Sequence, residues 1–287
     1  MSPALPRPFP RTYVLRLTGR CNERCSFCFV MDEIEEGRPI AFDDVRRQIL
    51  EAKKAGYTRV DFFGGEPTTY PFLAEAFGLA ADLGLEAMLA TNAVRFASAA
   101  YARSFFRRAR PLAVRVSLYS HDAGFHDRVT ALPGSFVKTL AGIRNILKHH
   151  ERLGVSVLIL SENAGRLAEI VELVHGLGCP GIKFIGLIET DRTGHAYPEL
   201  AYDLGALEKP LAAAIRAAER RGMLVQLEKL PVCIAPGRAE RFVQEAPDET
   251  FFKAPFCRLC RLEPFCPGLS KPAIERGGIP PFARPIA

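Results

Sequence analysis

The chain has 287 residues, of which 48% are hydrophobic and 24% are charged, a composition typical of a globular protein with one large domain or one domain and a small appendage. No uncharged apolar run reaches the roughly 18 residues that a membrane-spanning helix needs, so we expect no membrane span. The net charge of +6, from 38 basic and 32 acidic residues, is too small an excess to favour a nucleic-acid-binding protein.

Residues 1–11 contain Pro and Arg but no apolar core segment, so we expect an N-terminal tail without a signal peptide. Eight cysteines in a chain that lacks such a signal indicate metal ligation in a reducing compartment rather than disulfides. We therefore expect a cytoplasmic protein.

Strands and helices are predicted to alternate over residues 12–200. The predicted strands cover residues 13–17, 58–63, 85–90, 112–118, 155–160 and 182–188. Helical periodicity covers residues 43–55, 72–83, 97–109, 134–153 and 167–177. Strands and helices that alternate with short connections predict a parallel α/β sheet. Eight such units would close a barrel, so the six units here predict a partial (β/α)6 TIM-like barrel.

Residues 201–287 have a different character. A helix is predicted at 207–221, with Pro210 tolerated in its first turn, and a strand at 224–227. Four further cysteines follow this strand. We therefore expect residues 201–287 to form a small cysteine-rich C-terminal extension.

Polar or glycine-rich residues lie at or just beyond the end of each of the first five predicted strands. They are the loop with Cys21, Cys25 and Cys28, the turn Gly64-Gly65-Glu66, the pair Thr91 and Asn92, Ser117, and Ser161. Because the carboxyl ends of parallel strands meet at one edge of a sheet, these residues predict a functional site at that edge. His121, just beyond the fourth strand, is either an acid or base of this site or a plain loop histidine.

The first three cysteines have the spacing C-x3-C-x2-C. Three thiolates this close can hold an iron–sulfur cube of four irons and leave one iron open to another ligand. The alternatives are buried thiols or a structural zinc site, although zinc needs four tetrahedral ligands. For Gly64-Gly65-Glu66, the alternative to a ligand-binding turn is a tight strand-to-helix turn with Pro67 early in the helix.

The order C-x3-C-x-aromatic-C, with Phe27 as the aromatic residue, resembles the signature of radical S-adenosylmethionine (SAM) enzymes. The resemblance implies a 4Fe-4S cluster on the three cysteines, with SAM on the open iron. It implies reductive cleavage of SAM to a 5′-deoxyadenosyl radical, which abstracts hydrogen from a substrate carbon. The SAM-binding residues that it implies are Phe27, Gly64, Gly65, Glu66, Asn92 and Ser117. Thr130 stands where many relatives carry an arginine for the SAM carboxylate, so that role is not assigned.

The remaining cysteines also form a pattern. Cys257, Cys260 and Cys266 have the spacing C-x2-C-x5-C and follow Cys233, which resembles the SPASM and twitch extensions of radical SAM enzymes. The resemblance implies one auxiliary 4Fe-4S cluster at most, because Ser270 stands where the larger extension has another cysteine. A four-cysteine zinc site is the alternative. Cys179 is read as a buried hydrophobic residue.

The resemblance implies an oxidoreductase-type radical SAM enzyme that takes electrons from a reductant such as flavodoxin or ferredoxin. The expected reaction is oxidation or cross-linking of a ribosomally made peptide. A dehydrogenase for a small amino sugar or alcohol is the alternative within the family, and a non-catalytic metal-binding or sensing protein is the alternative of another class. The sequence identifies no catalytic acid or base.

Overall fold

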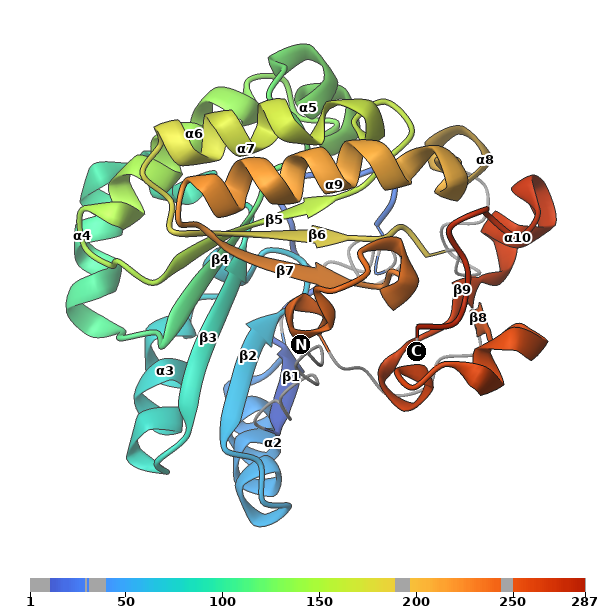
Figure 1. The fold of residues 1–287 in the computed structure, drawn as a ribbon. Coiled ribbons are helices and arrows are strands. Elements are labelled where there is room, and N and C mark those ends of the chain that lie inside the picture. The colour runs from blue at the N-terminus through green and yellow to red at the C-terminus, as the bar shows by residue number, and fades with distance from the viewer. Residues whose placement is uncertain (1–10, 29, 31–39, 189–196, 244–249, 287) are drawn as a thin grey trace. The chain divides into compact units, whose positions relative to one another are not determined.

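The structure is a computed structural model that describes residues 11–28, 30, 40–188, 197–243 and 250–286 (Figure 1). Seven strands form one sheet in the order β1 to β7. They are β1 (Thr12–Arg16), β2 (Arg59–Phe63), β3 (Glu86–Thr91), β4 (Ala113–Ser117), β5 (Leu153–Leu158), β6 (Gly181–Ile185) and β7 (Leu224–Glu228). The strands are parallel, which confirms the predicted α/β class.

Helices follow most of the strands. They are α2 (Phe42–Lys54), α3 (Leu73–Asp82), α4 (Ala99–Arg108), α5 (Ala123–Thr130), α6 (Ser135–Leu147), α7 (Leu167–Gly176), α8 (Tyr197–Leu200), α9 (Leu204–Arg220) and α10 (Lys271–Gly277). A second, antiparallel pair of strands is formed by β8 (Phe251–Phe252) and β9 (Leu269–Ser270). The chain divides into two compact units.

The first unit comprises residues 10–156 and 177–180. It contains β1 to β4, the start of β5, and α2 to α6, with α2, α3 and α4 on one side of the strands (Figure 1). Strand residues alternate between two faces. Val60 and Phe62 of β2 are fully buried, as are Val114 and Val116 of β4, while Arg115 and Ser117 of β4 are only half-buried. One face of these strands is therefore packed and the other is partly accessible.

The second unit comprises the described residues of 157–176 and 181–286. Its strands β6 and β7 pair along their whole length, from Gly181 with Leu224 to Ile185 with Glu228. The sequence placed residues 224–227 in the C-terminal extension, whereas here they extend the main sheet. Asp203 caps helix α9, because its side chain accepts a hydrogen bond from the Gly205 N–H. The helix begins at Leu204, so Pro210 lies beyond the first turn rather than in it.

Two local predictions differ from the structure. Helix α6 ends at Leu147, and β5 already begins at Leu153, because residues 153–156 pair with 114–117 of β4. The helix predicted to reach residue 153 is therefore about one and a half turns too long. Helix α5 was not predicted; it begins where the Asp122 side chain accepts a hydrogen bond from the Phe125 N–H at 2.8 Å.

Candidate active site

The cysteine loop follows β1 and is fastened to the end of α5 in the same unit. The N–H of Arg24 donates to Thr130 O at 2.9 Å, and the N–H of Ser26 donates to Val129 O at 3.0 Å. These two carbonyls belong to the last turn of a helix and lack partners within it. The Cys28 N–H closes a turn onto Cys25 O at 3.0 Å. The helix end thus fixes the backbone that carries the thiols.

The chemistry of these thiols fits a metal centre. Burial raises the pKa of Cys21 to about 12 and that of Cys25 well above its usual value, and nearby acids and thiols raise both further. Three thiolates therefore need a strong local positive charge, which bound iron supplies. The Glu23 N–H already donates to Cys21 Sγ at 3.4 Å, as backbone donors do at iron–sulfur sites.

Gly64 and Gly65 lie against the backbone of the cysteine loop. A Cβ on Gly64 would lie 2.8 Å from Thr18 O, and a Cβ on Gly65 would lie 2.3 Å from Arg20 O. The Gly65 N–H donates to Thr18 O, and the Glu66 N–H donates to Arg20 O, both at 2.7 Å. The two glycines therefore let the turn after β2 pack against the cysteine loop. The sequence did not show that this loop is what the glycines contact.

Glu66 joins the ends of β2 and β3. Its buried carboxylate accepts four hydrogen bonds, from Thr68 N at 3.1 Å, Thr68 Oγ1 at 2.6 Å, Thr91 Oγ1 at 2.6 Å and Asn92 N at 2.8 Å. Burial raises the pKa of Glu66, and these donors oppose that rise. Three of the four bonds are made by Oε1 and one by Oε2, so Oε2 retains capacity for a further donor.

Asn92 connects β3 to the cysteine loop. Its Nδ2 donates to Asn22 Oδ1 at 2.8 Å, and its Oδ1 accepts from the Val94 N–H at 3.1 Å. Its main-chain oxygen accepts a hydrogen bond from Thr139 Oγ1 at 3.0 Å. The next turn of α6 packs just as closely, because a Cβ on Gly142 would lie 2.2 Å from Ala93 O. Helix α6 therefore packs against the turn after β3 that contains Asn92.

Phe27 and Ser117 meet through Tyr119. The rings of Phe27 and Tyr119 contact edge to face with centroids 4.8 Å apart, and Ser117 hydrogen-bonds the Tyr119 hydroxyl. Tyr119 is buried, and burial raises its pKa well above the usual value. The aromatic residue of the cysteine motif therefore packs on the segment that follows β4.

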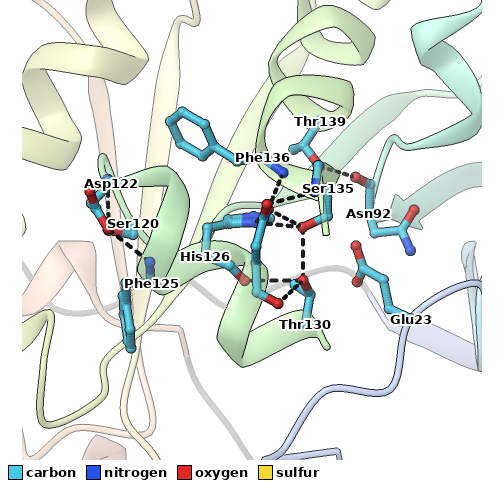
Figure 2. A network of polar contacts seen from close by, with 12 residues as sticks. Glu23, Asn92, Ser120, Asp122, Phe125, His126, Thr130, Ser135, Phe136 and Thr139 are labelled. Atoms are coloured by element: carbon cyan, nitrogen blue, oxygen red, sulfur yellow. Dashed lines mark hydrogen bonds and ion pairs between the residues drawn. The ribbon is translucent and has the colours of Figure 1, made fainter. Parts of the chain in front are cut away.

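Thr130, which stands where many members of the resembled family carry an arginine, belongs to a buried polar network (Figure 2). Thr130 is fully buried, and its Oγ1 donates to His126 O at 3.0 Å and lies 2.8 Å from Ser135 Oγ. Asp127 accepts hydrogen bonds from Ser135 Oγ and from the N–H groups of Gly134 and Phe136, which begin α6. The Thr130 hydroxyl thus hydrogen-bonds within the protein and is not available to a ligand. Burial lowers the pKa of His126 to about 4, so this histidine is neutral at pH 7.

Glu23 is a site residue that the sequence analysis missed. It lies between the first two cysteines, is only 3% exposed, and has its Oε2 3.5 Å from Cys25 Sγ. Burial, followed by the charge of Glu66, raises the pKa of Glu23 to about 8. Its carboxyl group also hydrogen-bonds the side chain of Asn92. The position of a charged residue between two cysteines of the motif is the sequence signal that could have identified Glu23 as a site residue.

Two other candidates have local structural roles. In the second unit, Ser161 Oγ donates to Glu199 O at 2.8 Å, so this hydroxyl holds a loop. In the first unit, His121 follows β4 and is half-buried, and within the described residues its Nδ1 makes no hydrogen bond. Ser161 belongs to the second unit and the cysteine loop to the first.

The four C-terminal cysteines lie in the second unit. Burial raises the pKa of Cys233 to about 12, and the nearby thiols of Cys266 and Cys257 raise it further. Backbone N–H groups face their sulfurs, with Val232 N 3.4 Å from Cys266 Sγ and Ile286 N 3.4 Å from Cys260 Sγ. The eighth thiol, Cys179, is buried in the first unit, as expected for a core residue.

The model of the radical SAM superfamily matches residues 15–174. The chain belongs to the radical SAM superfamily. An AdoMet-dependent heme synthase of Methanosarcina barkeri is 28% identical over 185 residues, which are 64% of this chain and 52% of that protein. A PqqA peptide cyclase of Bradyrhizobium diazoefficiens is 27% identical over 165 residues, 57% of this chain and 43% of that protein. The chain spans about half the length of these curated relatives.

Solved structures share the fold. Streptococcus suis SuiB bound to the precursor peptide SuiA superposes with a TM-score of 0.63 at 17% identity, covering 77% of this chain and 48% of that one. SuiB bound to S-adenosylmethionine superposes with a TM-score of 0.65 at 17% identity, covering 79% and 53%. None of the helices in the described residues is long and apolar enough to span a membrane.

Proposed function

We propose that the protein is an enzyme that binds a 4Fe-4S cluster through Cys21, Cys25 and Cys28, cleaves SAM reductively and abstracts hydrogen from a substrate carbon. The observation that carries this proposal is the fastening of the cysteine loop to the Gly64-Gly65-Glu66 turn at the carboxyl ends of β1 and β2. When bound, the cluster and SAM supply a 5′-deoxyadenosyl radical. The protein supplies binding, orientation and shielding from water.

The residues around the loop fit SAM, which carries an ammonium, a carboxylate and ribose hydroxyls. The turn of Gly64 and Gly65 and the Oε2 of Glu66 offer acceptors to an ammonium, and two buried carboxyls, Glu23 and Glu66, favour a cationic ligand. Asn92 and Ser117 are proposed to contact the ribose and carboxylate. Phe27 packs on Tyr119 and shields one side of the cluster loop. These roles rest on the family resemblance together with this geometry.

We further propose that, within the range 201–287 indicated by the sequence, the residues that follow β7 form a twitch-like extension of the partial barrel. Its four cysteines would hold an auxiliary 4Fe-4S cluster. Backbone N–H groups that face two of the sulfurs support this cluster.

A ribosomally made peptide is the substrate class that we propose. Similarity to a PqqA peptide cyclase and to SuiB, which was solved with its precursor peptide, supports this class. Similarity to an AdoMet-dependent heme synthase supports a small-molecule substrate as the second candidate. In either case the enzyme would work in the cytoplasm with a flavodoxin or ferredoxin as electron donor.

The direct test of the function is anaerobic reconstitution followed by reaction with SAM. The loaded protein is expected to hold about eight irons, four for each cysteine set. Reduced with dithionite, it is expected to convert SAM to 5′-deoxyadenosine, measured by chromatography, even without substrate. Iron-loaded protein that binds no SAM and forms no 5′-deoxyadenosine would contradict the proposal, whereas four irons with one zinc would contradict the auxiliary cluster alone.

A second prediction separates the two cysteine sets. Replacing Cys257, Cys260 and Cys266 by alanine is expected to remove about four irons and stop product formation while SAM cleavage continues. The reason is that these thiols belong to the second unit and the cysteine loop to the first. Circular dichroism and limited proteolysis check that the extension stays folded, because loss of a metal site can unfold a small module. Full product formation by a folded variant would show that the second set is only structural.

A further inference from the structure

The sheet of the first unit has a packed face and, opposite it, a partly accessible face that we call the open face. In parallel β/α barrels, bulky branched side chains usually fill the space inside the sheet. On the open face, by contrast, β3, β4 and the start of β5 carry half-buried residues that are small or polar except for Met88. These residues are Met88, Ala90, Ala113, Arg115, Ser117, Gly154 and Ser156. The strands therefore leave this face accessible instead of filling it with apolar side chains.

Arg115 is a half-buried cation in the middle strand of this face. Its neighbours across the sheet are Ala90 of β3 and Gly154 of β5, so no large side chain stands beside Arg115 in its row. Its Nη2 donates to Oδ2 of the buried Asp61 on β2. An arginine carries five N–H donors, and within the described residues those on Nε and Nη1 of Arg115 make no hydrogen bond. The guanidinium is therefore anchored on one side and has donors left for a ligand.

Stability alone does not account for the ion pair of Asp61 and Arg115. Taking two charges out of water costs about as much free energy as their attraction returns, and apolar residues of the same size often stabilise a protein as well or better. The backbone pairing of β2 with β3 and of β3 with β4 already fixes the distance between the strands that carry the two residues. What the buried carboxylate does add is orientation, because it holds the guanidinium in one position on the open face.

The charge on the open face favours a monoanion. Strands β1 to β4 place three basic residues on it, Arg16, Arg59 and Arg115, and two acidic residues, Asp61 and Glu86. Arg59 pairs with Glu86 at 2.7 Å near the amino-terminal end of the strands, so the face as a whole has one positive charge in excess. The planar fork of a guanidinium matches a carboxylate. A single excess charge suits a carboxylate better than a phosphate, which carries about −1.5 to −2.

We propose, on the basis of the radical SAM function proposed above, that Arg115, oriented by Asp61, binds a carboxylate of the substrate on the open face. The substrate is then a peptide or small molecule that carries a carboxylate. Ser117, which is proposed to contact SAM, lies on the same face of β4, two residues or about 7 Å closer to the carboxyl end. A carboxylate bound at Arg115 thus lies one row of residues below the SAM site and holds other carbons of the same molecule close to it.

The test measures the binding of carboxylate probes to the full-length, iron-loaded protein with SAM present and no reductant, so that SAM is not cleaved. The probes are N-acetylglutamate N-methylamide for an acidic peptide side chain, N-acetylalanine for a peptide C-terminus and glutarate for a small acid. Each is compared with its uncharged amide in a saturation-transfer NMR titration. The parent protein is expected to bind one of the probes at least about tenfold more tightly than its amide. Which probe shows this preference identifies the source of the carboxylate.

Arg115→Met combined with Asp61→Asn removes both charges together, so no buried charge is left unpaired and the protein is expected to stay folded, as circular dichroism checks. This variant is expected to lose the preference for the carboxylate probe, while its affinity for SAM, measured by equilibrium dialysis, stays at the parent value. Arg59→Met combined with Glu86→Gln is the matched control. It removes an ion pair near the amino-terminal end of the same face with the same zero change in net charge, and the preference is expected to remain.

Three outcomes would overturn the carboxylate site. They are no preference for a carboxylate in the parent protein, a preference that survives in the Arg115→Met, Asp61→Asn variant, and a loss of SAM affinity in that variant with the probe preference unchanged. The last outcome would assign Arg115 to the carboxylate of SAM instead of the substrate. Failure of the proposed function is seen separately, because iron content and 5′-deoxyadenosine formation are measured on the parent protein without any probe.

Discussion

Replacing Cys21, Cys25 and Cys28 together by alanine is expected to abolish 5′-deoxyadenosine formation and to leave about four irons per chain. The physical reason is that the three thiolates are the ligands that hold the proposed cube. The carboxyl group of Glu23 also lies in the described part of the loop, with its Oε2 3.5 Å from Cys25 Sγ. A single carboxylate cannot replace three soft thiolate ligands.

The measurement compares iron content, absorbance and SAM cleavage in the triple variant and the parent protein. Cys179→Ala is the matched control, because this thiol is buried in the same unit and its loss is expected to leave iron content and cleavage unchanged. A small cost in stability, of about 1 kcal/mol, is expected for that core substitution. SAM cleavage at the parent rate in the triple variant would rule out the catalytic cluster.

The cysteine motif was readable from the sequence because its ligands are neighbours in the chain. A cluster needs thiols a few residues apart, and the spacing of Cys21, Cys25 and Cys28 states this requirement directly. The α/β class was readable for a similar reason, since the buried strands and the amphipathic helices each carry a local pattern. Both predictions depend on periods or spacings shorter than about 15 residues.

Contacts between residues that are far apart in the chain could not be predicted from the sequence. Glu66 accepts from Thr91 Oγ1, 25 residues away, and Asn92 donates to Asn22, 70 residues away. Propensity carries no information about such pairs, because they depend on the order of strands in the sheet. The role of Gly65 was hidden in the same way, since the atom that it approaches belongs to Arg20. The sequence indicated that a glycine was needed there, but not what it approaches.

Errors at the ends of elements have a tertiary cause as well. Residues 148–153 continue a helical pattern, yet Leu153 and Gly154 pair with β4 and so belong to the sheet. Helix α5 is short, and its start depends on the Asp122 cap rather than on a long apolar period. Burial of Glu23 contradicts the usual place of a charged residue at the surface. The buried Glu23 belongs to the proposed site, where exceptions to local rules are expected because function imposes its own demands.

Replacing Gly65 by alanine is expected to lower SAM cleavage by about 100-fold, because a displacement of roughly 1 Å at a reacting centre has an effect of that order. The added Cβ would lie 2.3 Å from Arg20 O, a backbone atom that cannot rotate away. The turn and the cysteine loop must therefore move apart. Their two hydrogen bonds, Gly65 N–H to Thr18 O and Glu66 N–H to Arg20 O, lengthen with them. Overpacking of this kind typically costs about 1–3 kcal/mol of stability.

Gly78→Ala provides the control for this experiment. Gly78 lies in α3 of the same unit, and a Cβ there meets nothing within 4 Å. The same substitution is therefore expected to stabilise the protein by about 0.5–1 kcal/mol without changing SAM cleavage. Melting by circular dichroism, iron content and the cleavage rate per bound cluster are measured for both variants. A folded, iron-loaded Gly65→Ala protein that cleaves SAM at the parent rate would show that the close contact between the turn and the cysteine loop is not needed to place SAM.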